Sequence, residues 1–262
     1  MHKIVFITGG SSGIGLAAAK ALSQKGCTVY EMSRKPSSYE NIHHITGDVT
    51  KPSEIKTAVD TVISNEGRID VLINNAGFGI SGCAEFTEQE AAEKQMKVNF
   101  LGCANVCRYV IPVMRESGGR IVNISSVAAA VPIPFQAFYS ASKAAINAYS
   151  MALQIEVKPF GISVCAVMPG DIKTNFTKAR EKQLFGDDIY NGRIGRSVQK
   201  MEHDEQNGMS PEKAGEYIAK ISLKKRVKPL YAIRADYKFI TILAKLLPSG
   251  ALNFIVGKLY AR

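Results

Sequence analysis

The sequence predicts an α/β protein in which parallel strands form a doubly wound sheet with helices on both faces. Short β-branched runs alternate with helical segments from residue 3 to about residue 168. The first strand runs directly into a glycine-rich turn that opens a helix. Strands separated by helices pair in parallel, and a parallel sheet is covered on both faces. A chain of 262 residues can fold around one core, so we expect a single domain over 1–262.

The strands are predicted from short runs of β-branched and other apolar residues. About seven strands are expected, and six can be located: Lys3–Thr8, Thr28–Ser33, Ile42–Thr46, Val71–Asn74, Arg120–Ser125 and Ile162–Val167.

Turn and capping residues predict the helix ends. The first helix is expected to end at Gly26, because glycine is favoured just beyond a helix. A second helix is expected over 52–67, with Thr50 as its N-cap. Thr87 and Glu90 have the spacing of a capping box at the start of another helix.

The regular alternation lapses between Asp171 and Gly208, in a polar stretch rich in charge and glycine. We expect a mobile loop with short helices over about 171–210. It follows a strand, so it lies near the carboxyl edge of the sheet, where open α/β sheets bind ligands. Substrate contacts and a closing lid are its expected uses. Ser210-Pro211-Glu212 then begins a further helix.

Composition and cysteine usage restrict the class of protein. The chain opens directly as a strand, without the leader pattern of a secretory signal. The apolar run from Phe239 to Leu247 is broken by Lys245 and followed by Pro248, so it is not expected to span a bilayer. The cysteines have no metal-ligand spacing, so we expect reduced, buried thiols, no metal and a cytoplasmic compartment; they are Cys27, Cys83, Cys103, Cys107 and Cys165.

Almost all of the net charge of +10 lies in the tail. Residues 220–262 hold ten Lys and Arg against one acidic residue, a net +9. No nucleic acid is expected, because no reader helix, zinc knuckle or aromatic RNA platform is recognisable. The basic and apolar C-terminal segment, about 229–262, suits an anionic membrane surface or a phosphate-bearing substrate. A solvated basic edge is the alternative.

The turn after the first strand predicts a dinucleotide site. Glycines let the backbone turn sharply and approach a pyrophosphate at the positive end of a helix. The strand–turn–helix context that this interpretation requires is present, although a purely structural glycine turn is the alternative. The residues expected at the phosphates are Gly9, Ser11, Ser12, Gly13, Ile14 and Gly15.

The end of the second strand favours NADP(H) over NAD(H). Binders of NAD usually place a carboxylate there for the ribose 2′-hydroxyl. This chain has Ser33-Arg34-Lys35, and Arg34 can hold a 2′-phosphate through two hydrogen bonds. Glu31 is the rival carboxylate, two residues earlier along the strand.

Tyr139 and Lys143 predict the reacting centre. Four residues apart on a helix, their side chains lie one turn above each other. A cation beside a phenol stabilises the phenolate, so Lys143 is expected to lower the pKa of Tyr139 from about 10. A tyrosine with such a pKa transfers protons near neutral pH.

The chain resembles the short-chain dehydrogenases/reductases over nearly its whole length. Its sequence is similar to the branch that includes 17β-hydroxysteroid, retinol and acyl-dihydroxyacetone-phosphate reductases. The family has a Rossmann-type sheet and exchanges a hydride between a nicotinamide cofactor and a carbonyl or alcohol. The motifs that carry the resemblance are the glycine turn, Asn74-Asn75-Ala76-Gly77, Asn99, Ser125-Ser126, Tyr139-x-x-x-Lys143 and Pro169-Gly170.

The resemblance implies further cofactor contacts. Asp48 resembles the residue that meets the adenine, with Val49 beside it. The other positions match the segment that lines the ribose and nicotinamide (Asn75, Ala76, Gly77) and the loop that fixes the carboxamide (Pro169, Gly170, Ile172, Thr174).

The resemblance also implies catalytic roles. Tyr139 would donate the proton, while Lys143 lowers its pKa and holds the ribose. Ser126 would hydrogen-bond the substrate oxygen, with Ser125 as the alternative that family spacing disfavours. Asn99 resembles the residue whose helical bend holds a water in a proton relay.

The substrate is less well specified. We expect NADPH-dependent reduction of a lipophilic ketone or aldehyde, because the apolar stretch within 229–262 suits the roof of a lipid pocket. Acyl-carrier or small polyol and sugar substrates, and a dinucleotide-sensing regulator without turnover, are the alternatives. A homodimer or homotetramer is implied by the family, through helices at about 99–117 and 139–158. Their apolar stripes, which suit an internal core equally well, are Val106, Val110, Val113, Ala144, Ala148 and Ala152.

Overall fold

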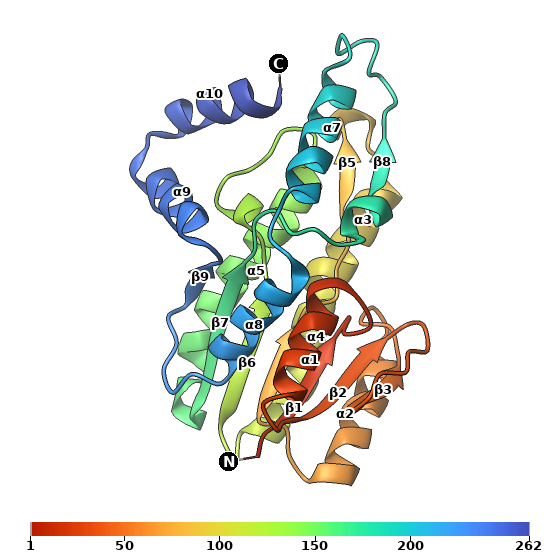
Figure 1. Ribbon diagram of the computed structural model, residues 1–262, viewed down its shortest axis with the longest axis vertical. Coiled ribbons are helices and arrows are strands. Elements are labelled where there is room, and N and C mark those ends of the chain that lie inside the picture. Colours follow the sequence, from red (N-terminus) through yellow and green to blue (C-terminus); the bar gives the residue numbers. More distant parts are fainter. Residues whose placement is uncertain (1, 262) are drawn as a thin grey trace.

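A computed structural model describes residues 2–261, and its central feature is one parallel sheet (Figure 1). The strand order is β3-β2-β1-β4-β6-β7-β9. The strands are β1 (Ile4–Thr8), β2 (Thr28–Ser33), β3 (Ile42–Thr46), β4 (Val71–Asn74), β6 (Gly119–Ile124), β7 (Ile162–Met168) and β9 (Leu230–Ala232). The predicted fold class is therefore confirmed, and the six predicted strands end within one residue of the observed ones.

A pair of short strands stands apart from this sheet. β5 (Ile80–Gly82) and β8 (Glu181–Gln183) pair in parallel with each other. Neither these two strands nor β9 was located from the sequence, because each is only three residues long.

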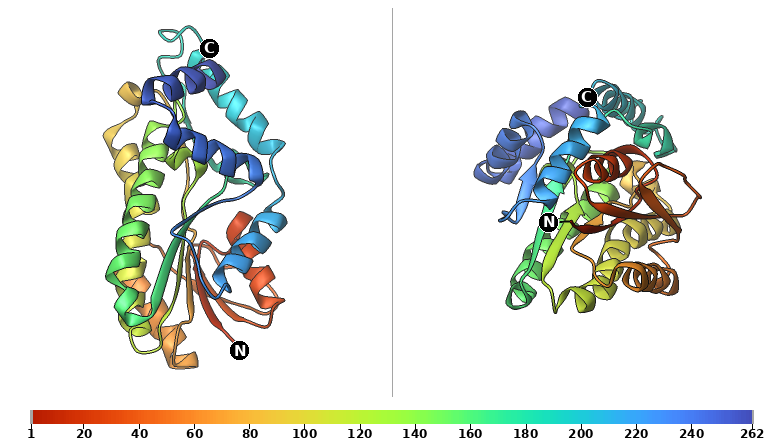
Figure 2. Two further views of the ribbon diagram at one scale, coloured as in Figure 1. Left: turned by 90° about the vertical axis from the view of Figure 1, so that its left-hand side faces the viewer. Right: turned by 60° about the horizontal axis from the view of Figure 1, so that its bottom comes forward.

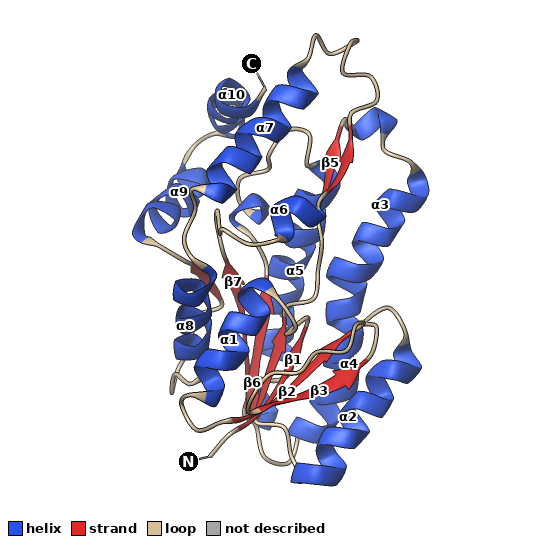
Figure 3. Cartoon of the chain, turned by 45° about the vertical axis from the view of Figure 1, so that its right-hand side comes forward, coloured by secondary structure: helices blue, strands red, loops and turns tan. Residues whose placement is uncertain are grey.

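Helices cover both faces of the sheet (Figure 3). Side chains of α1 and α8 pack on one face, and those of α2, α4 and α5 on the other. The helices are α1 (Gly13–Ser23), α2 (Pro52–Glu66), α3 (Gln89–Met96), α4 (Gly102–Met114), α5 (Ala137–Glu156), α6 (Phe176–Ala179), α7 (Arg193–Gln206), α8 (Pro211–Ser222), α9 (Ala235–Leu246) and α10 (Ser249–Tyr260).

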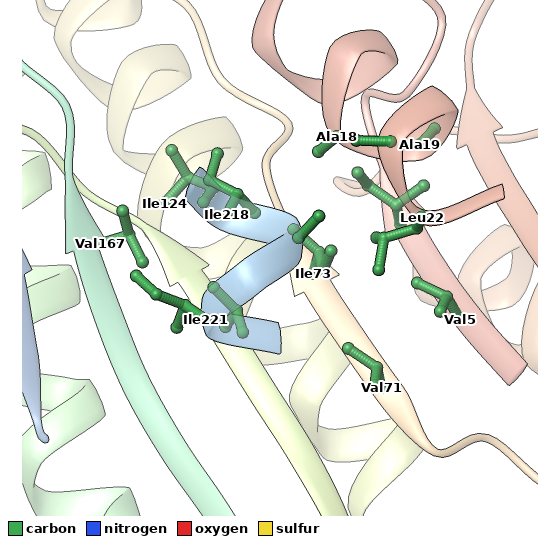
Figure 4. Packing of buried hydrophobic residues seen from close by; sticks show 14 of the residues in the cluster. Val5, Ala18, Ala19, Leu22, Val71, Ile73, Ile124, Val167, Ile218 and Ile221 are labelled. Carbon is green, nitrogen blue, oxygen red and sulfur yellow. The ribbon is translucent and has the colours of Figure 1, made fainter. Parts of the chain in front are cut away.

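Strand alternation distributes the apolar side chains between these two layers. Val5 of β1 belongs to the cluster under α1 and α8, whereas its neighbour Phe6 belongs to the cluster on the opposite face. Figure 4 shows Leu22 of α1 and Ile218 of α8 among the side chains of the first cluster. A Cβ added to Gly215 would lie 2.4 Å from the backbone of Ala17, so α8 packs closely on α1.

Two predicted N-caps are wrong, and α1 ends at Ser23, three residues before the predicted Gly26. α2 begins as expected, but its N-cap is the residue after Thr50 and makes no side-chain capping bond. The N-cap of α3 is the residue after Thr87, and the Thr87 hydroxyl donates to the carbonyl of Cys83 instead. Ser210 does cap α8, accepting a hydrogen bond from the backbone of Lys213 at 3.4 Å.

The segment over about 171–210 has more regular structure than the sequence predicted, since it contains α6, β8 and the 14-residue α7. These elements lie beyond the carboxyl ends of the strands, together with α9 and α10 (Figure 2). In the part of the chain that the structure describes, no helix has both the length and the apolar character to span a bilayer. The five cysteines are free and buried, as predicted.

Candidate active site

The glycine turn brings β1, α1 and the end of β4 into close contact. Gly9 and Gly13 adopt left-handed φ values of 66° and 55°. A Cβ on Gly15 would lie 2.3 Å from the carbonyl oxygen of Gly9, so a side chain there has no space. The amide of Asn75 donates to the same oxygen at 2.9 Å. The turn is thus held in place by Asn75, one of the predicted cofactor residues.

The start of α1 fits a pyrophosphate. Its first turn contains no acidic residue, and the exposed Ser12 at its N-cap makes no side-chain capping bond. Backbone N–H groups at such an end are ready donors for an anion. Thr174 lies against this turn, 3.7 Å from the position of a Cβ on Gly13. Ser11 and Ile14, also predicted here, are partly buried within the turn.

At the end of β2 the cationic side chains are exposed and the carboxylate is buried. Arg34 and Lys35 are exposed. Glu31 is 0% exposed, and its Oε1 accepts a hydrogen bond from the Ser37 hydroxyl at 2.6 Å and contacts Nδ1 of His44. The rival carboxylate is therefore turned into the protein, while the cations face outward.

The predicted adenine residues differ in what they offer a ligand. One carboxylate oxygen of Asp48 accepts from the backbone of Thr50 at 2.8 Å. The Val49 side chain is buried in the cluster under α4, close enough to Gly102 that a Cβ there would lie 2.8 Å away. Only the backbone of Val49 is available to a nucleotide.

Tyr139, Lys143 and Ser126 come together where β6 ends beside α5. The Lys143 Nζ lies 5.8 Å from the centroid of the Tyr139 ring and donates to the Ile124 carbonyl at 2.8 Å. Ser126 is close enough to the Tyr139 hydroxyl to lower its pKa, and its own hydroxyl oxygen accepts from the backbone N–H of Ala128 at 3.1 Å. Ser125 is buried, and its hydroxyl donates to the backbone of Lys143 at 2.9 Å. Of the two serines, Ser126 faces the phenol.

The electrostatics of this pair correct one prediction. Burial raises the pKa of Tyr139 to about 12. Ser126 lowers that pKa, but its effect is smaller than that of burial. Burial also lowers the pKa of Lys143 to about 8. The expectation that Lys143 lowers the pKa of Tyr139 is wrong for the protein alone. Its ammonium group is bound to a carbonyl, and burial disfavours its charged form.

Asn99 lies in a π-helical turn, Lys97–Leu101, between α3 and α4. Its side-chain amide makes two hydrogen bonds with the backbone of Phe78. The amide oxygen accepts from the Phe78 N–H and the amide nitrogen donates to the Phe78 carbonyl, each at 3.0 Å. A Cβ on Gly77 would lie 3.1 Å from Asn99 Oδ1 and 3.6 Å from Lys143 Nζ. The predicted Asn99, Gly77 and Lys143 therefore converge, at the kind of π-turn often found at functional sites.

The Pro169-Gly170 loop is covered by the C-terminal segment. A Cβ on Gly170 would lie 2.2 Å from the ring of Tyr237 in α9. The Tyr237 hydroxyl contacts the Asp171 carboxylate and accepts from the Asp171 backbone at 3.1 Å. Ile172 is buried in the apolar cluster under α1 and α8, so its side chain is structural.

With this geometry established, comparison with known proteins identifies the family. The family model described as short chain dehydrogenase matches residues 3–184. The chain belongs to the short-chain dehydrogenase family. It is accordingly an NAD(P)-dependent oxidoreductase, as expected.

Individual relatives cover most of the chain. A 3-ketodihydrosphingosine reductase of Bacteroides thetaiotaomicron is 45% identical over 227 residues, 85% of this chain and 84% of the relative. A probable short-chain type dehydrogenase/reductase of Helicobacter pylori is 33% identical, over 93% of both chains. A short-chain dehydrogenase structure from Streptomyces avermitilis has a TM-score of 0.83 and 30% identity, covering 99% of this chain and 95% of its own.

Four further side chains of this short-chain dehydrogenase, one of which contacts Tyr139, form a connected group that was missed from the sequence. The Phe176 ring centroid lies 5.8 Å from that of Tyr139, and the Arg180 guanidinium lies 5.6 Å from the Phe176 ring. Arg180 pairs with Glu205, to which Thr177 also donates at 2.6 Å. The sequence marked only the surrounding segment, as a substrate loop.

Proposed function

We propose that this short-chain dehydrogenase reduces the ketone of a lipophilic, long-chain substrate with NADPH. The observation that carries the proposal is the apolar surface of α9 and α10, which Tyr237 attaches to the cofactor loop at Gly170. A ketone on a long chain also agrees with the name of the relative from Bacteroides thetaiotaomicron.

In this proposal the chain supplies the acid and the oxyanion contacts. The nicotinamide cofactor, held by the glycine turn, Asn75 and the 169–174 loop, supplies the hydride when bound. Ser126 hydrogen-bonds the carbonyl oxygen, and Tyr139 gives that oxygen its proton as the carbon is reduced. Lys143 adds positive charge beside the phenol as negative charge develops, and Asn99 fixes the loop at Gly77.

Tyr139 is in the protonation state that the acid of carbonyl reduction requires. With a pKa of about 12, its hydroxyl is protonated at neutral pH. A protonated phenol can donate a proton to the developing oxyanion.

The side chains at the end of β2 support NADPH as the cofactor. Arg34 and Lys35 are exposed where a 2′-phosphate would lie, and both are cations. The Glu31 carboxylate, which would favour a 2′-hydroxyl and repel a phosphate, is buried among Ser37 and His44.

We further propose that α9 and α10 contact an anionic lipid surface. Along α9, large apolar side chains recur at helical spacing on an exposed face, with Lys238 and Lys245 on the same helix. The exposed apolar side chains of the two helices are Phe239, Ile240, Ile242, Leu243, Leu246, Phe254, Ile255 and Leu259. Basic residues among apolar ones suit anionic headgroups above acyl chains.

The sequence suggested two apolar helical stripes for subunit pairing, and the structure leaves only the stripe on α5 exposed. Val106 and Val110 of α4 are buried in the chain's own core. The α5 residues Ala144, Ala148 and Ala152 are exposed. We propose that a homo-oligomer forms through this face of α5.

The test of the proposed reaction is NADPH oxidation with 3-ketodihydrosphingosine in detergent micelles. Tyr139→Phe should lower the rate by roughly 10²- to 10⁴-fold, as loss of a general acid does, while NADPH binding persists. Tyr109→Phe on α4 is the matched control and should keep full activity. Activity of wild type on sugars or acyl-carrier substrates alone would contradict the lipid proposal. Inactivity of wild type on ketones of every class, with NADPH bound, would favour a regulator.

A further inference from the structure

Arg180 is a buried cation whose hydrogen-bonding capacity is mostly unused. It caps the C-terminus of the short α6 and is 4% exposed. One of its terminal nitrogens, Nη2, pairs with the Glu205 carboxylate of α7. Within residues 2–261, its Nε and Nη1 are buried without a hydrogen-bond partner. Buried polar groups are normally satisfied, so these donors require an explanation.

One aromatic ring separates Arg180 from the reacting centre. The Phe176 ring contacts both the Tyr139 ring, at 5.8 Å between centroids, and the Arg180 guanidinium, at 5.6 Å. Both members of the Arg180–Glu205 pair are close enough to Tyr139 to act on its pKa, the cation lowering it and the carboxylate raising it. A substrate whose ketone reaches Tyr139 and which extends past Phe176 would therefore approach Arg180.

The charges in this corner favour a neutral partner for Arg180. Glu205 already balances the guanidinium charge and is itself held by the Thr177 hydroxyl at 2.6 Å. The charge of the Arg180 guanidinium is therefore balanced, but two of its nitrogens still lack hydrogen-bond acceptors. If the pair served only to join α6 to α7, its buried donors would be left permanently unpaired, which lowers the stability of the fold.

We propose that Arg180 determines substrate specificity by donating hydrogen bonds to a hydroxyl oxygen carried close to the ketone, with Glu205 as the residue that positions its guanidinium. The inference rests on the proposed ketone reduction and specifies its substrate class as a hydroxy ketone.

The test compares two soluble ketones that differ only in that hydroxyl, 1-hydroxydecan-3-one and decan-3-one. Wild type should favour the hydroxy ketone in kcat/KM by roughly 10- to 100-fold, as expected for a hydrogen bond from a charged donor. Arg180→Met should bring that ratio close to one, whatever change it causes in kcat/KM for decan-3-one itself. Arg180→Lys, which keeps one donor group, should restore part of the ratio.

A matched control is Lys182→Met, which removes a more exposed ion pair between β8 and Glu202 of the same helix, α7. It should preserve the ratio. A ratio that persists in Arg180→Met overturns the proposal, as does an equal loss with both ketones in a folded protein. If Arg180→Met does not fold, Arg180→Lys decides, since an unchanged ratio there also overturns it.

Binding separates this inference from the proposed reaction. Calorimetry of the enzyme–NADP complex should show tighter binding of decane-1,3-diol than of decan-3-ol, and the difference should vanish in Arg180→Met. If wild type binds the diol preferentially but reduces neither ketone, the reduction proposal fails and the Arg180 site stands. If it reduces both ketones equally and binds both alcohols equally, the Arg180 site fails and the reduction stands.

Discussion

Replacing Lys143 with Met should stabilise the protein at neutral pH even though it removes a proposed catalytic group. Lys143 is 5% exposed, and burial lowers its pKa from 10.5 to about 8. At about 1.4 kcal/mol for each tenfold change, holding the charged form inside the fold is penalised by about 3 kcal/mol. The Ile124 carbonyl would lose its partner, which costs about 1–3 kcal/mol. The net gain is up to about 2 kcal/mol, or up to about 8 °C in Tm.

The pH dependence identifies the cause. Below pH 8 the lysine is protonated in the folded and the unfolded chain, so the penalty is complete. Between pH 8 and 10.5 the unfolded chain holds a proton that the folded chain has released, so wild-type stability rises with pH. The advantage of Lys143→Met should therefore be largest below pH 8 and shrink as pH rises toward 10.5.

Urea unfolding of the cofactor-free protein, followed by circular dichroism from about pH 6.5 to about pH 9.5, measures this difference. Lys158→Met, at an exposed site just beyond α5, is the control and should show no such trend. A difference between Lys143→Met and wild type that stays constant over this range would refute the reasoning. So would a variant that is less stable than wild type at the acidic end.

Three further outcomes are expected. Arg34→Asp should weaken NADPH binding by about 10²-fold, as loss of a charge-assisted phosphate contact does, and leave NADH binding largely unchanged. Equal effects on both cofactors in a titration would show that Arg34 does not bind the 2′-phosphate. Gly15→Ala should abolish dinucleotide binding, because its Cβ would lie 2.3 Å from the Gly9 carbonyl, whereas Gly250→Ala, with open space around it, should bind normally in the same titration. Leu246→Glu, at a position 76% exposed, should reduce co-sedimentation with phosphatidylglycerol vesicles without changing turnover of decan-3-one; undiminished sedimentation would argue against a lipid contact through α9.

Local chemistry explains why most of the sheet could be predicted. Strands such as Ile4–Thr8 and Val71–Asn74 are apolar runs bounded by polar or glycine residues, so pattern and structure agree. β9 is three residues long and follows a basic stretch, and its place at the sheet edge is decided by pairing with β7. Thr87 failed as a cap because the Cys83 carbonyl competes for its hydroxyl.

The candidate site could also be predicted only in part. Tyr139, Lys143 and Ser126 could be found because spacing along a helix or past a strand places them together. Their pKa values could not, because burial by residues distant in sequence sets them. Arg180 and Glu205 lie 25 residues apart in a stretch for which the sequence predicted no long helix, so only the fold brings them together.

Tyr237 links the proposed lipid surface to the reacting centre. Its ring occupies the space that a side chain at Gly170 would need, and its hydroxyl binds Asp171. The loop that the family resemblance assigns to the carboxamide is therefore fixed to α9 at one end. The other end of that loop leads into Phe176, whose ring contacts Tyr139, and to Arg180, which lies over the Phe176 ring. The proposed surface contact and the proposed specificity thus depend on the same short segment, 170–180.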